Sequence, residues 1–176
     1  MNQSSFKRLR VRPRPGDRTQ GRLAAGPLVI PVALGRGGIR ANKREGDGGT
    51  PRGDFRLVRV WYRADRHPAP RTRLPVRRIT EHIAWCEDPR DRRYNRPFCR
   101  AAGEPGDRLR RDDNLYDFIV EIDHNARPRV AGRGSAVFIH VARPGFRPTA
   151  GCIALTLPRL RWLLARAGPQ TRIEIR

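Results

Sequence analysis

The chain has 176 residues, a length that suits a single domain with a core of its own. Lys and Arg number 38 against 17 Asp and Glu, so the formal net charge is +21, and almost all of the positive charge is arginine. A charge of this size attracts polyanions, which makes nucleic acid and other anionic polymers candidate partners. No stretch approaches the roughly 18 consecutive apolar residues of a membrane-spanning helix, and the N-terminus through Gly21 lacks the apolar segment of an export signal.

The basic residues are spread through every segment, and no nucleic-acid-binding motif accompanies them, so we expect no nucleic-acid partner. Metal binding is also poorly supported, because no C-x-x-C occurs and the four histidines are not at ligand spacing. We therefore expect neither a metal nor another cofactor. Among the three cysteines, Cys86 and Cys99 are compatible with a disulfide that closes a short loop and equally with two free thiols.

The N-terminal part is expected to be a basic arm over residues 1–25, with the folded domain over residues 26–176. Arginines there alternate with Pro13, Pro15 and Gly16, a composition that buries little apolar surface. Leu9 and Val11 also alternate with arginines, so a short edge strand in the arm remains an alternative.

Further along, continuous apolar runs predict strands over residues 28–34 and 136–139. Alternating or short apolar segments predict strands over residues 54–62, 115–123 and 171–175. A short strand is also expected to begin over residues 79–81. One helix is predicted to begin at Thr156, with Pro158 in its first turn and Gly168-Pro169 after its end. Residues 86–113 are long, charged and irregular, which is typical of a loop that borders an active site. Many short strands and one helix indicate a mainly β (α+β) domain.

The residues with the clearest chemical potential are His140 and Cys152. An apolar run places His140 at a strand end, and Cys152 follows Gly151 directly before another apolar run. A histidine beside a cysteine provides a base for a thiol nucleophile. Gly151 permits a tight backbone whose amides point at a developing oxyanion. The alternative is a small buried cysteine and a structural histidine.

The segment Gly134-Ser135-Ala136-Val137-Phe138-Ile139-His140, followed by Thr149-x-Gly151-Cys152, resembles the signature of the L,D-transpeptidase catalytic domain family (YkuD-like). That family has an upstream His followed by a Ser/Thr-His-Gly-Cys block. The resemblance implies a YkuD-like β-sandwich with one C-terminal helix and a long active-site loop. It also implies a cysteine acyltransferase, with Cys152 as nucleophile, His140 as general base and acid, and Gly151 in the oxyanion region.

Three further matches lie upstream in the family's order, and together they extend the resemblance over about residues 26–176. Gly49-Thr50-Pro51-Arg52-Gly53-Asp54-Phe55 resembles the family's Thr-Pro-x-Gly-x-Phe turn and strand. Trp85-Cys86-Glu87-Asp88-Pro89, with Tyr94-Asn95-Arg96-Pro97, resembles a segment of one signal-less proteobacterial branch. Leu115-Tyr116-Asp117 to His124-Asn125 resembles the strand pair before the catalytic His.

The sequence also departs from the family pattern. Ala150 stands where the family block has His, and Ala154 replaces the polar residue two positions after the cysteine. The interval from His140 to Cys152 is shorter than in the best-known members. The nucleophile and base carry over, whereas the residues that position the substrate do not, so the identity of the acyl donor stays open.

The function implied by the resemblance is cross-linking of peptidoglycan stem peptides through a Cys152 thioester. The donor bond is either the one that gives the usual 3-3 link or the one after the first L-Ala, which gives a 1-3 link. Carboxypeptidase or amino-acid exchange at the same site is an alternative, as is a non-enzymatic basic module that binds polyanions. We expect a monomer that acts in the bacterial cell envelope or periplasm, without a membrane span and with an export route that this sequence does not explain. The candidate substrate-binding residues are Tyr116, Arg143, Arg147, Thr149, Trp85, Tyr94 and Asn95.

Overall fold

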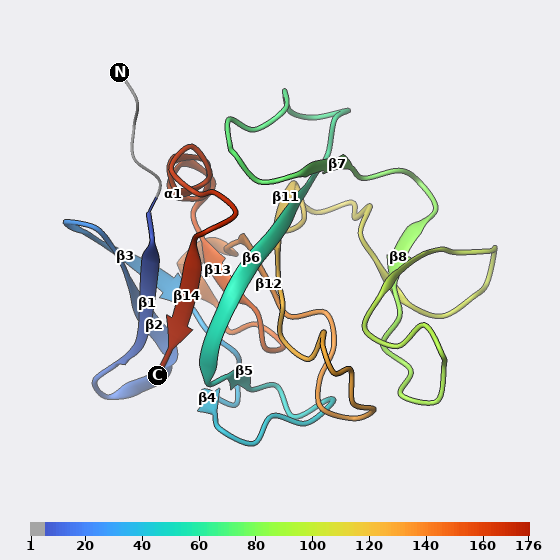
Figure 1. Ribbon diagram of the computed structural model, residues 1–176, viewed down its shortest axis with the longest axis horizontal. Helices are drawn as coiled ribbons and strands as arrows, with labels where there is room; N and C mark the ends of the chain where they lie inside the picture. The colour runs from blue at the N-terminus through green and yellow to red at the C-terminus, as the bar shows by residue number, and fades with distance from the viewer. Residues whose placement is uncertain (1–5) are drawn as a thin grey trace.

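The computed structural model describes residues 6–176, which form a β-rich fold with one α-helix (Figure 1). Among these residues no helix is long and apolar enough to cross a membrane. The strands are β1 (Arg8–Arg14), β2 (Asp17–Ala25), β3 (Leu28–Ala33), β4 (Ile39–Arg40), β5 (Thr50–Pro51), β6 (Gly53–Tyr62), β7 (Val76–Arg78), β8 (Ile83–Trp85), β9 (Pro97–Cys99), β10 (Asp107–Arg108), β11 (Phe118–Ile122), β12 (Phe138–Val141), β13 (Ile153–Leu155) and β14 (Arg172–Ile175). The helices are η1, a 3₁₀ turn (Pro144–Phe146), and α1 (Leu157–Leu164).

The main sheet contains nine strands in the order β11-β12-β13-β3-β2-β1-β14-β6-β7. It closes on itself because β6 also pairs with β11, the strand at the other end of this order. The closed sheet leaves few unpaired edges and encloses a core between its opposed sides. This architecture is mainly β, as predicted, and the two layers of the expected sandwich are the two sides of one continuous sheet.

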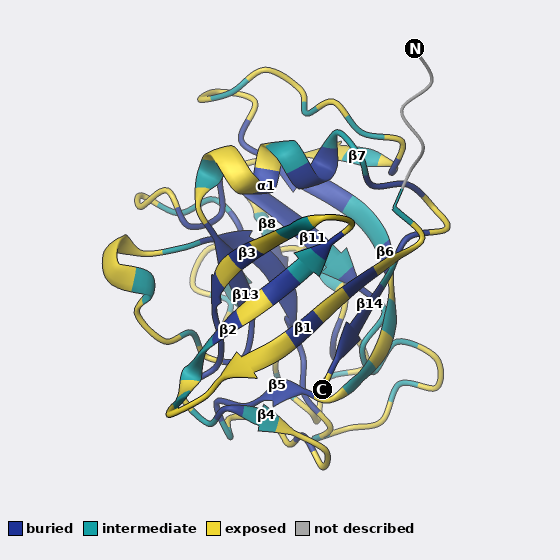
Figure 2. Ribbon diagram, turned by 90° about the vertical axis from the view of Figure 1, so that its left-hand side faces the viewer, coloured by how far each residue is buried: buried dark blue, intermediate teal, exposed yellow. Residues whose placement is uncertain are grey.

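The expected basic arm over residues 1–25 needs correction. Residues 8–25 form β1 and β2, and β1 lies inside the sheet between β2 and β14. The side chains of Leu9 and Val11 are fully buried, while the alternating Arg8, Arg10 and Arg12 are exposed, a pattern that Figure 2 shows along β1. Two apolar residues at period two were therefore enough for a strand, because neighbouring strands on both sides bury them. Residues 1–5, the rest of the predicted arm, lie outside the described residues.

Two apolar clusters lie on opposite faces of β11 and β12. The larger cluster fills the interior of the closed sheet and includes Val120 and Ile139, which are fully buried. The smaller cluster covers the outer face and includes Ile119 and Phe138. The predicted strand over residues 115–123 is shorter in the structure, and it is buried on both faces because β6, β12 and residues 79–116 all pack around it.

Residues 79–116 form an accessory lobe against this outer face. It contains a small sheet in the order β10-β8-β9, which Figure 1 shows to one side of the main sheet. The short strand expected over residues 79–81 begins instead at Ile83, and the segment over residues 86–113, expected to be irregular, contributes β9 and β10. All three cysteines are free, so Cys86 and Cys99 are not bridged.

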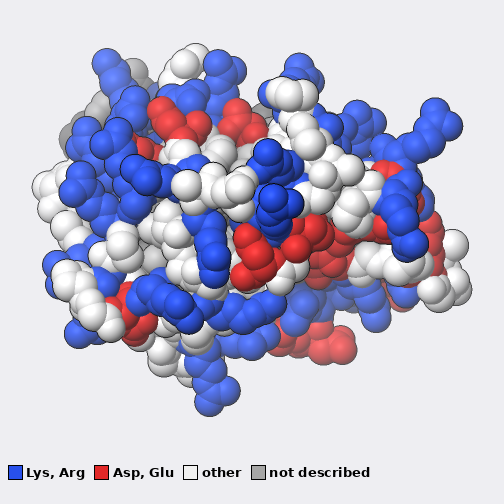
Figure 3. Space-filling model, turned by 90° about the horizontal axis from the view of Figure 1, so that it is seen from below, with Lys and Arg blue, Asp and Glu red and all other residues white. Residues whose placement is uncertain are grey.

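The C-terminal helix follows the prediction. Thr156 is the N-cap residue of α1 and Pro158 lies in the first turn, although the Thr156 side chain makes no capping hydrogen bond. Leu160, Leu163 and Leu164 are fully buried against the interior core. Seen from below, basic side chains cover much of the surface and acidic side chains gather in patches between them (Figure 3).

Candidate active site

Two parallel strands bring the predicted nucleophile and base onto one face of the sheet. In the β12–β13 register His140 pairs with Ala154, and Cys152 lies two residues before Ala154. Because side chains alternate along a strand, His140, Ala154 and Cys152 all point to the outer face, toward the accessory lobe. Ala154 is small, so the space opposite His140 is not filled by a side chain from β13. All three residues line one pocket.

Cys152 is held at the floor of this pocket with 7% of its surface exposed. Its Sγ donates a hydrogen bond to the carbonyl oxygen of Ala136 at 3.2 Å and accepts one from the Phe138 N–H at 3.3 Å. Ala136 adopts a positive φ of 50°, a backbone conformation that is rare for residues with a side chain. Burial raises the pKa of the Cys152 thiol to about 12, so the thiol is protonated at neutral pH.

His140 is buried in the same wall, with 6% of its surface exposed. Its Nδ1 lies 2.8 Å from the Val141 carbonyl oxygen, so Nδ1 carries the proton and donates to that carbonyl. The Nε2 atom makes no hydrogen bond among the described residues and is left as the basic nitrogen. Burial lowers the pKa of His140 to about 4, helped by the positive charges of Arg111 and Arg143.

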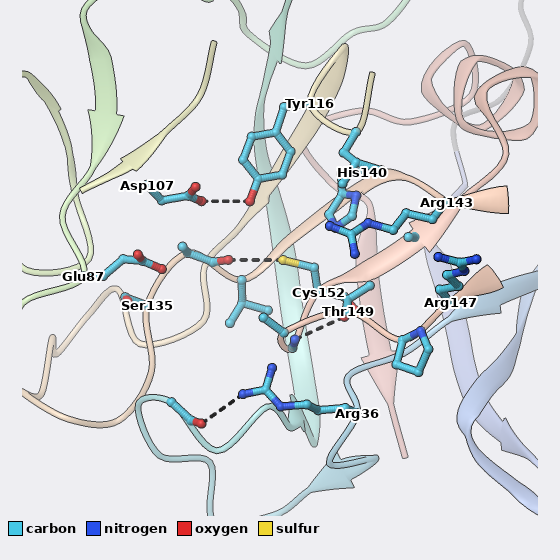
Figure 4. Close-up of a pocket in the computed structure, with 18 of the residues that line it drawn as sticks. Arg36, Glu87, Asp107, Tyr116, Ser135, His140, Arg143, Arg147, Thr149 and Cys152 are labelled. Atoms are coloured by element: carbon cyan, nitrogen blue, oxygen red, sulfur yellow. Dashed lines mark hydrogen bonds between the residues drawn. The ribbon is translucent and has the colours of Figure 1, made fainter. Parts of the chain in front are cut away.

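The resting pair is therefore a neutral thiol and a neutral imidazole rather than a thiolate and an imidazolium. Both shifts have the same cause, since a buried site disfavours whichever charged form would appear there. Figure 4 shows His140 and Cys152 on the same side of the pocket.

The turn before Cys152 is tied by the hydroxyl of Thr149. This Oγ1 donates to the Cys152 carbonyl oxygen at 2.6 Å and accepts the Gly151 N–H at 3.1 Å. Gly151 has a φ of 142°, and a Cβ added there would lie 2.8 Å from the Gly49 carbonyl oxygen. The Thr149 side chain therefore stabilises the turn as well as lining the pocket. The Gly151 N–H, which was predicted to lie in the oxyanion region, is already hydrogen-bonded to Thr149.

The pocket has a volume of about 510 Å³ and two walls of opposite charge. Arg36 lines the pocket, and the one hydrogen bond of its side chain among the described residues is to the Gly46 carbonyl oxygen. The basic wall presents Arg143 and Arg147, neither of which has an ion-pair partner among the described residues. The acidic wall presents Glu87 and Asp107 across the sulfur from these arginines (Figure 4). A substrate that carries both a carboxylate and an amine therefore finds complementary charge on both sides of Cys152.

Tyr116 lies between the acidic wall and the histidine. Its hydroxyl donates to Asp107 Oδ2 at 2.8 Å, and its ring packs edge-on against His140 with centroids 5.4 Å apart. Burial raises the pKa of Tyr116 well above its usual value, and burial also raises the pKa of Asp107. The predicted substrate-facing tyrosine thus lines the pocket and also orients the Asp107 carboxylate.

Three of the predicted substrate-binding residues do not line this pocket: Trp85, Tyr94 and Asn95. Asn95 is buried and accepts hydrogen bonds from the Trp85 Nε1–H and from the Ala136 N–H at 2.9 and 3.2 Å. The Tyr94 hydroxyl donates to Glu45 and accepts the Gly134 N–H. These side chains join the accessory lobe to the backbone before β12. Buried polar groups need partners, and here the partners are backbone and side-chain atoms rather than substrate.

The remaining predicted residues Tyr116, Arg143, Arg147 and Thr149 all line the pocket with Gly151. The sequence did not identify several pocket-lining residues that come from distant segments, among them Arg36, Glu87, Asp107 and Arg111. The sequence offered one indication of these residues, the expectation that the 86–113 segment borders the active site. Glu87, Asp107 and Arg111 of that segment do line the pocket. Nothing in the sequence indicated that Arg36, at the start of a glycine-rich turn, would reach the same pocket.

A family model for the L,D-transpeptidase catalytic domain (YkuD) matches residues 18–175, nearly the whole chain. The chain belongs to the L,D-transpeptidase catalytic domain family. A search of curated proteins and a search of solved structures found no match for it. The members of this family are cysteine-dependent transpeptidases that act on peptidoglycan stem peptides in the cell envelope.

Two alanines line the pocket of this L,D-transpeptidase domain near Cys152 and His140, and of these Ala154 is buried and Ala150 is exposed. Ala150 and Ala154, which replace the polar residues of the family pattern, both line the pocket. Small apolar side chains at these positions enlarge the cavity beside Cys152 and His140 and remove two hydrogen-bonding groups from it. Substrate orientation must then come from other residues, and the charged walls are the available ones. No group of His, Cys, Asp and Glu suited to a metal is found among residues 6–176.

Proposed function

We propose that this protein is a peptidoglycan L,D-transpeptidase that joins stem peptides through a thioester on Cys152. The observation that carries the proposal is the placement of Cys152 and His140 on one face of adjacent strands, at the floor of a pocket with oppositely charged walls. A buried structural cysteine would not open into a cavity of about 510 Å³ beside a histidine with an unpartnered Nε2.

The first half-reaction forms the acyl-enzyme. His140 Nε2 accepts the proton of the Cys152 thiol as the sulfur attacks the donor carbonyl carbon. Because the Gly151 amide is engaged, the Cys152 N–H is our candidate for the oxyanion donor. The resulting imidazolium gives its proton to the departing amine, so the C–N bond breaks and the thioester remains. The second half-reaction transfers the acyl group to the amine of another stem.

The donor binds with its carboxylate toward Arg143 and Arg147 in this proposal. An arginine fork pairs with a carboxylate through two parallel hydrogen bonds, and neither arginine forms an ion pair among the described residues. The small side chains of Ala150 and Ala154 along the pocket favour a donor bond other than the usual one, so we propose the bond after the first L-Ala, which yields 1-3 links. Because the proposed substrate is a peptidoglycan stem peptide, we also propose that the protein acts in the cell envelope.

The test is incubation of purified disaccharide-tetrapeptide muropeptides with the protein, followed by mass spectrometry and fragmentation of the products. We expect cross-linked dimers whose fragments identify a 1-3 link, and none with Cys152→Ala. Dimers with a 3-3 link would retain the transpeptidase and replace the donor. Shortened monomers alone would assign carboxypeptidase activity, and exchange of an added D-amino acid into monomers would assign exchange.

A Cys152→Ala protein that matches the wild type in every product would refute the catalytic role of the cysteine. If no species changes with a folded protein, the remaining alternative is the non-enzymatic basic module. That module would bind anionic polymer with an affinity that falls steeply as salt rises.

A further inference from the structure

The pocket contains a carboxylate that the acylation chemistry does not use. Glu87 makes no hydrogen bond and no ion pair among the described residues, although the protein has a net charge of +21. Every other acidic side chain of the pocket is engaged: Asp107 accepts from Tyr116, and Glu45 accepts from Tyr94 and Ser135. Glu87 is also exposed within the pocket, so its carboxylate is open to a cation that enters there.

The location of Glu87 relates it directly to the sulfur. Figure 4 shows its carboxylate directed into the pocket from the wall opposite Arg143 and Arg147, with Cys152 between them. The negative charges of Asp107 and Glu87 both contribute to raising the pKa of the Cys152 thiol, so these carboxylates act on the reacting atom through space. Desolvation by neighbouring atoms of the pocket, with the charges of Asp107 and Glu45, raises the pKa of Glu87 to about 7. A carboxylate with that proton affinity is suited to accept a proton near neutral pH.

His140 is poorly placed for the same task. An incoming amine arrives as an ammonium cation at neutral pH, and the imidazole is flanked by Arg111 and Arg143, whose charges repel cations. The wall with Glu87 and Asp107 carries the acidic side chains that lie opposite Arg143 and Arg147 in the pocket, and these carboxylates attract an ammonium.

We propose that Glu87 binds the protonated amine of the acceptor stem and removes its proton, so that the amine attacks the Cys152 thioester. This inference rests on the proposed function and assigns a residue to its second half-reaction. One ammonium proton moves to the Glu87 carboxylate, and the amine lone pair forms the C–N bond with the thioester carbon. A second amine proton passes to His140 Nε2 and then to the departing Cys152 sulfur as the C–S bond breaks. Glu87 returns its proton to water.

The experiment separates the two half-reactions with the full-length protein. The thioester formed on Cys152 from the disaccharide-tetrapeptide muropeptide is measured by intact-protein mass spectrometry. Its transfer is then followed at pH 7 to glycinamide, whose amine is mostly protonated, and to hydroxylamine, which is mostly uncharged. The variant is Glu87→Gln, and the control is Glu81→Gln, an exposed glutamate of the same lobe that does not line the pocket.

We expect Glu87→Gln to form the thioester at least as fast as the wild type, because a charge that raises the thiol pKa is removed, and to lose transfer to glycinamide by about 100-fold. Transfer to hydroxylamine should stay at the wild-type rate, because that nucleophile has no proton to give up before attack. Glu81→Gln should match the wild type in all three measurements.

Undiminished transfer to glycinamide in Glu87→Gln would overturn this inference alone. Equal losses with both nucleophiles would also overturn it, because they would indicate a structural role for Glu87. If the wild-type protein forms no thioester at all, the proposed function fails and the inference fails with it.

Discussion

The protonation state of His140 determines how the thiol is activated, and it can be tested through folding stability. In the folded protein, burial lowers the pKa of His140 to about 4, whereas an unfolded chain has a histidine pKa of 6.5. The unfolded state therefore binds a proton between these values while the folded state does not. Stability that is fully present above pH 6.5 is lost progressively as the pH falls toward 4.

The size of this loss follows from the two pKa values. At pH 7.5 both states are essentially neutral at this site, and at pH 5.0 the unfolded state is favoured by about 2 kcal/mol through His140 alone. The substitution His140→Asn removes the titrating group and keeps an amide that can donate to the Val141 carbonyl oxygen. We expect the wild-type free energy of unfolding to fall by about 2 kcal/mol more than that of His140→Asn over this interval.

The assay is urea denaturation at pH 7.5 and pH 5.0, with His82→Asn as the control for loss of an exposed histidine. All other titrating groups contribute equally to the wild type and the variant, so they cancel in the difference between the two pH values. The same pH dependence in the wild type and in His140→Asn would refute the neutral imidazole. A resting ion pair with the Cys152 thiolate would instead raise the His140 pKa, and the wild type would then gain stability relative to His140→Asn as the pH falls.

Three further predictions concern the residues around this pair. Asn95→Ala should lower the free energy of unfolding by about 2–4 kcal/mol in urea denaturation, because it leaves buried donors unpaired; a neutral effect on stability with loss of turnover would restore Asn95 as a substrate contact. Gly151→Ala should reduce the yield of acyl-enzyme in mass spectrometry, since its Cβ would lie 2.8 Å from the Gly49 carbonyl oxygen, and full acylation would contradict the tight turn. Cys152 should react with iodoacetamide at pH 7.5 at about one thousandth of the rate of an ordinary thiol, because its pKa is about 12 against 9.0. Peptide mass spectrometry should show that the exposed Cys99 is modified before Cys152. The reverse order would contradict the buried resting thiol.

Local patterns in the sequence were sufficient for the family, the mainly β class, the helix after Thr156 and the candidate pair His140 and Cys152. Alternation of apolar residues reports which side chains a strand can bury, and Pro158 near a cap residue reports where a helix begins. The same patterns did not predict β1 and β2 as strands. These segments carry so many arginines that a solvated arm was expected instead. Leu9 and Val11 are buried only because β2 and β14 lie beside β1, and that neighbourhood involves residues some 160 positions away along the chain.

The residues of the candidate site also divide into those that the sequence identified and those whose role depends on the fold. The types and spacing of His140, Gly151 and Cys152 are local, and a nucleophile with its base can be recognised from them. The sequence does not show whether Trp85, Tyr94 and Asn95 face the substrate or hold the accessory lobe in place. In the fold, the Asn95 side-chain oxygen accepts hydrogen bonds from Trp85 and from the backbone of Ala136, so these contacts belong to the packing of the lobe.

The charged walls and the protonation states belong to the tertiary structure alone. Glu87, Asp107, Arg36 and Arg147 come from segments far apart in the sequence and meet only when the closed sheet and the accessory lobe are assembled. Electrostatic energies depend on distances through space and on the exclusion of water, neither of which a linear pattern of residues encodes. The sequence by itself determined which atoms can react, and the fold decided their proton affinities and which charges a substrate would meet.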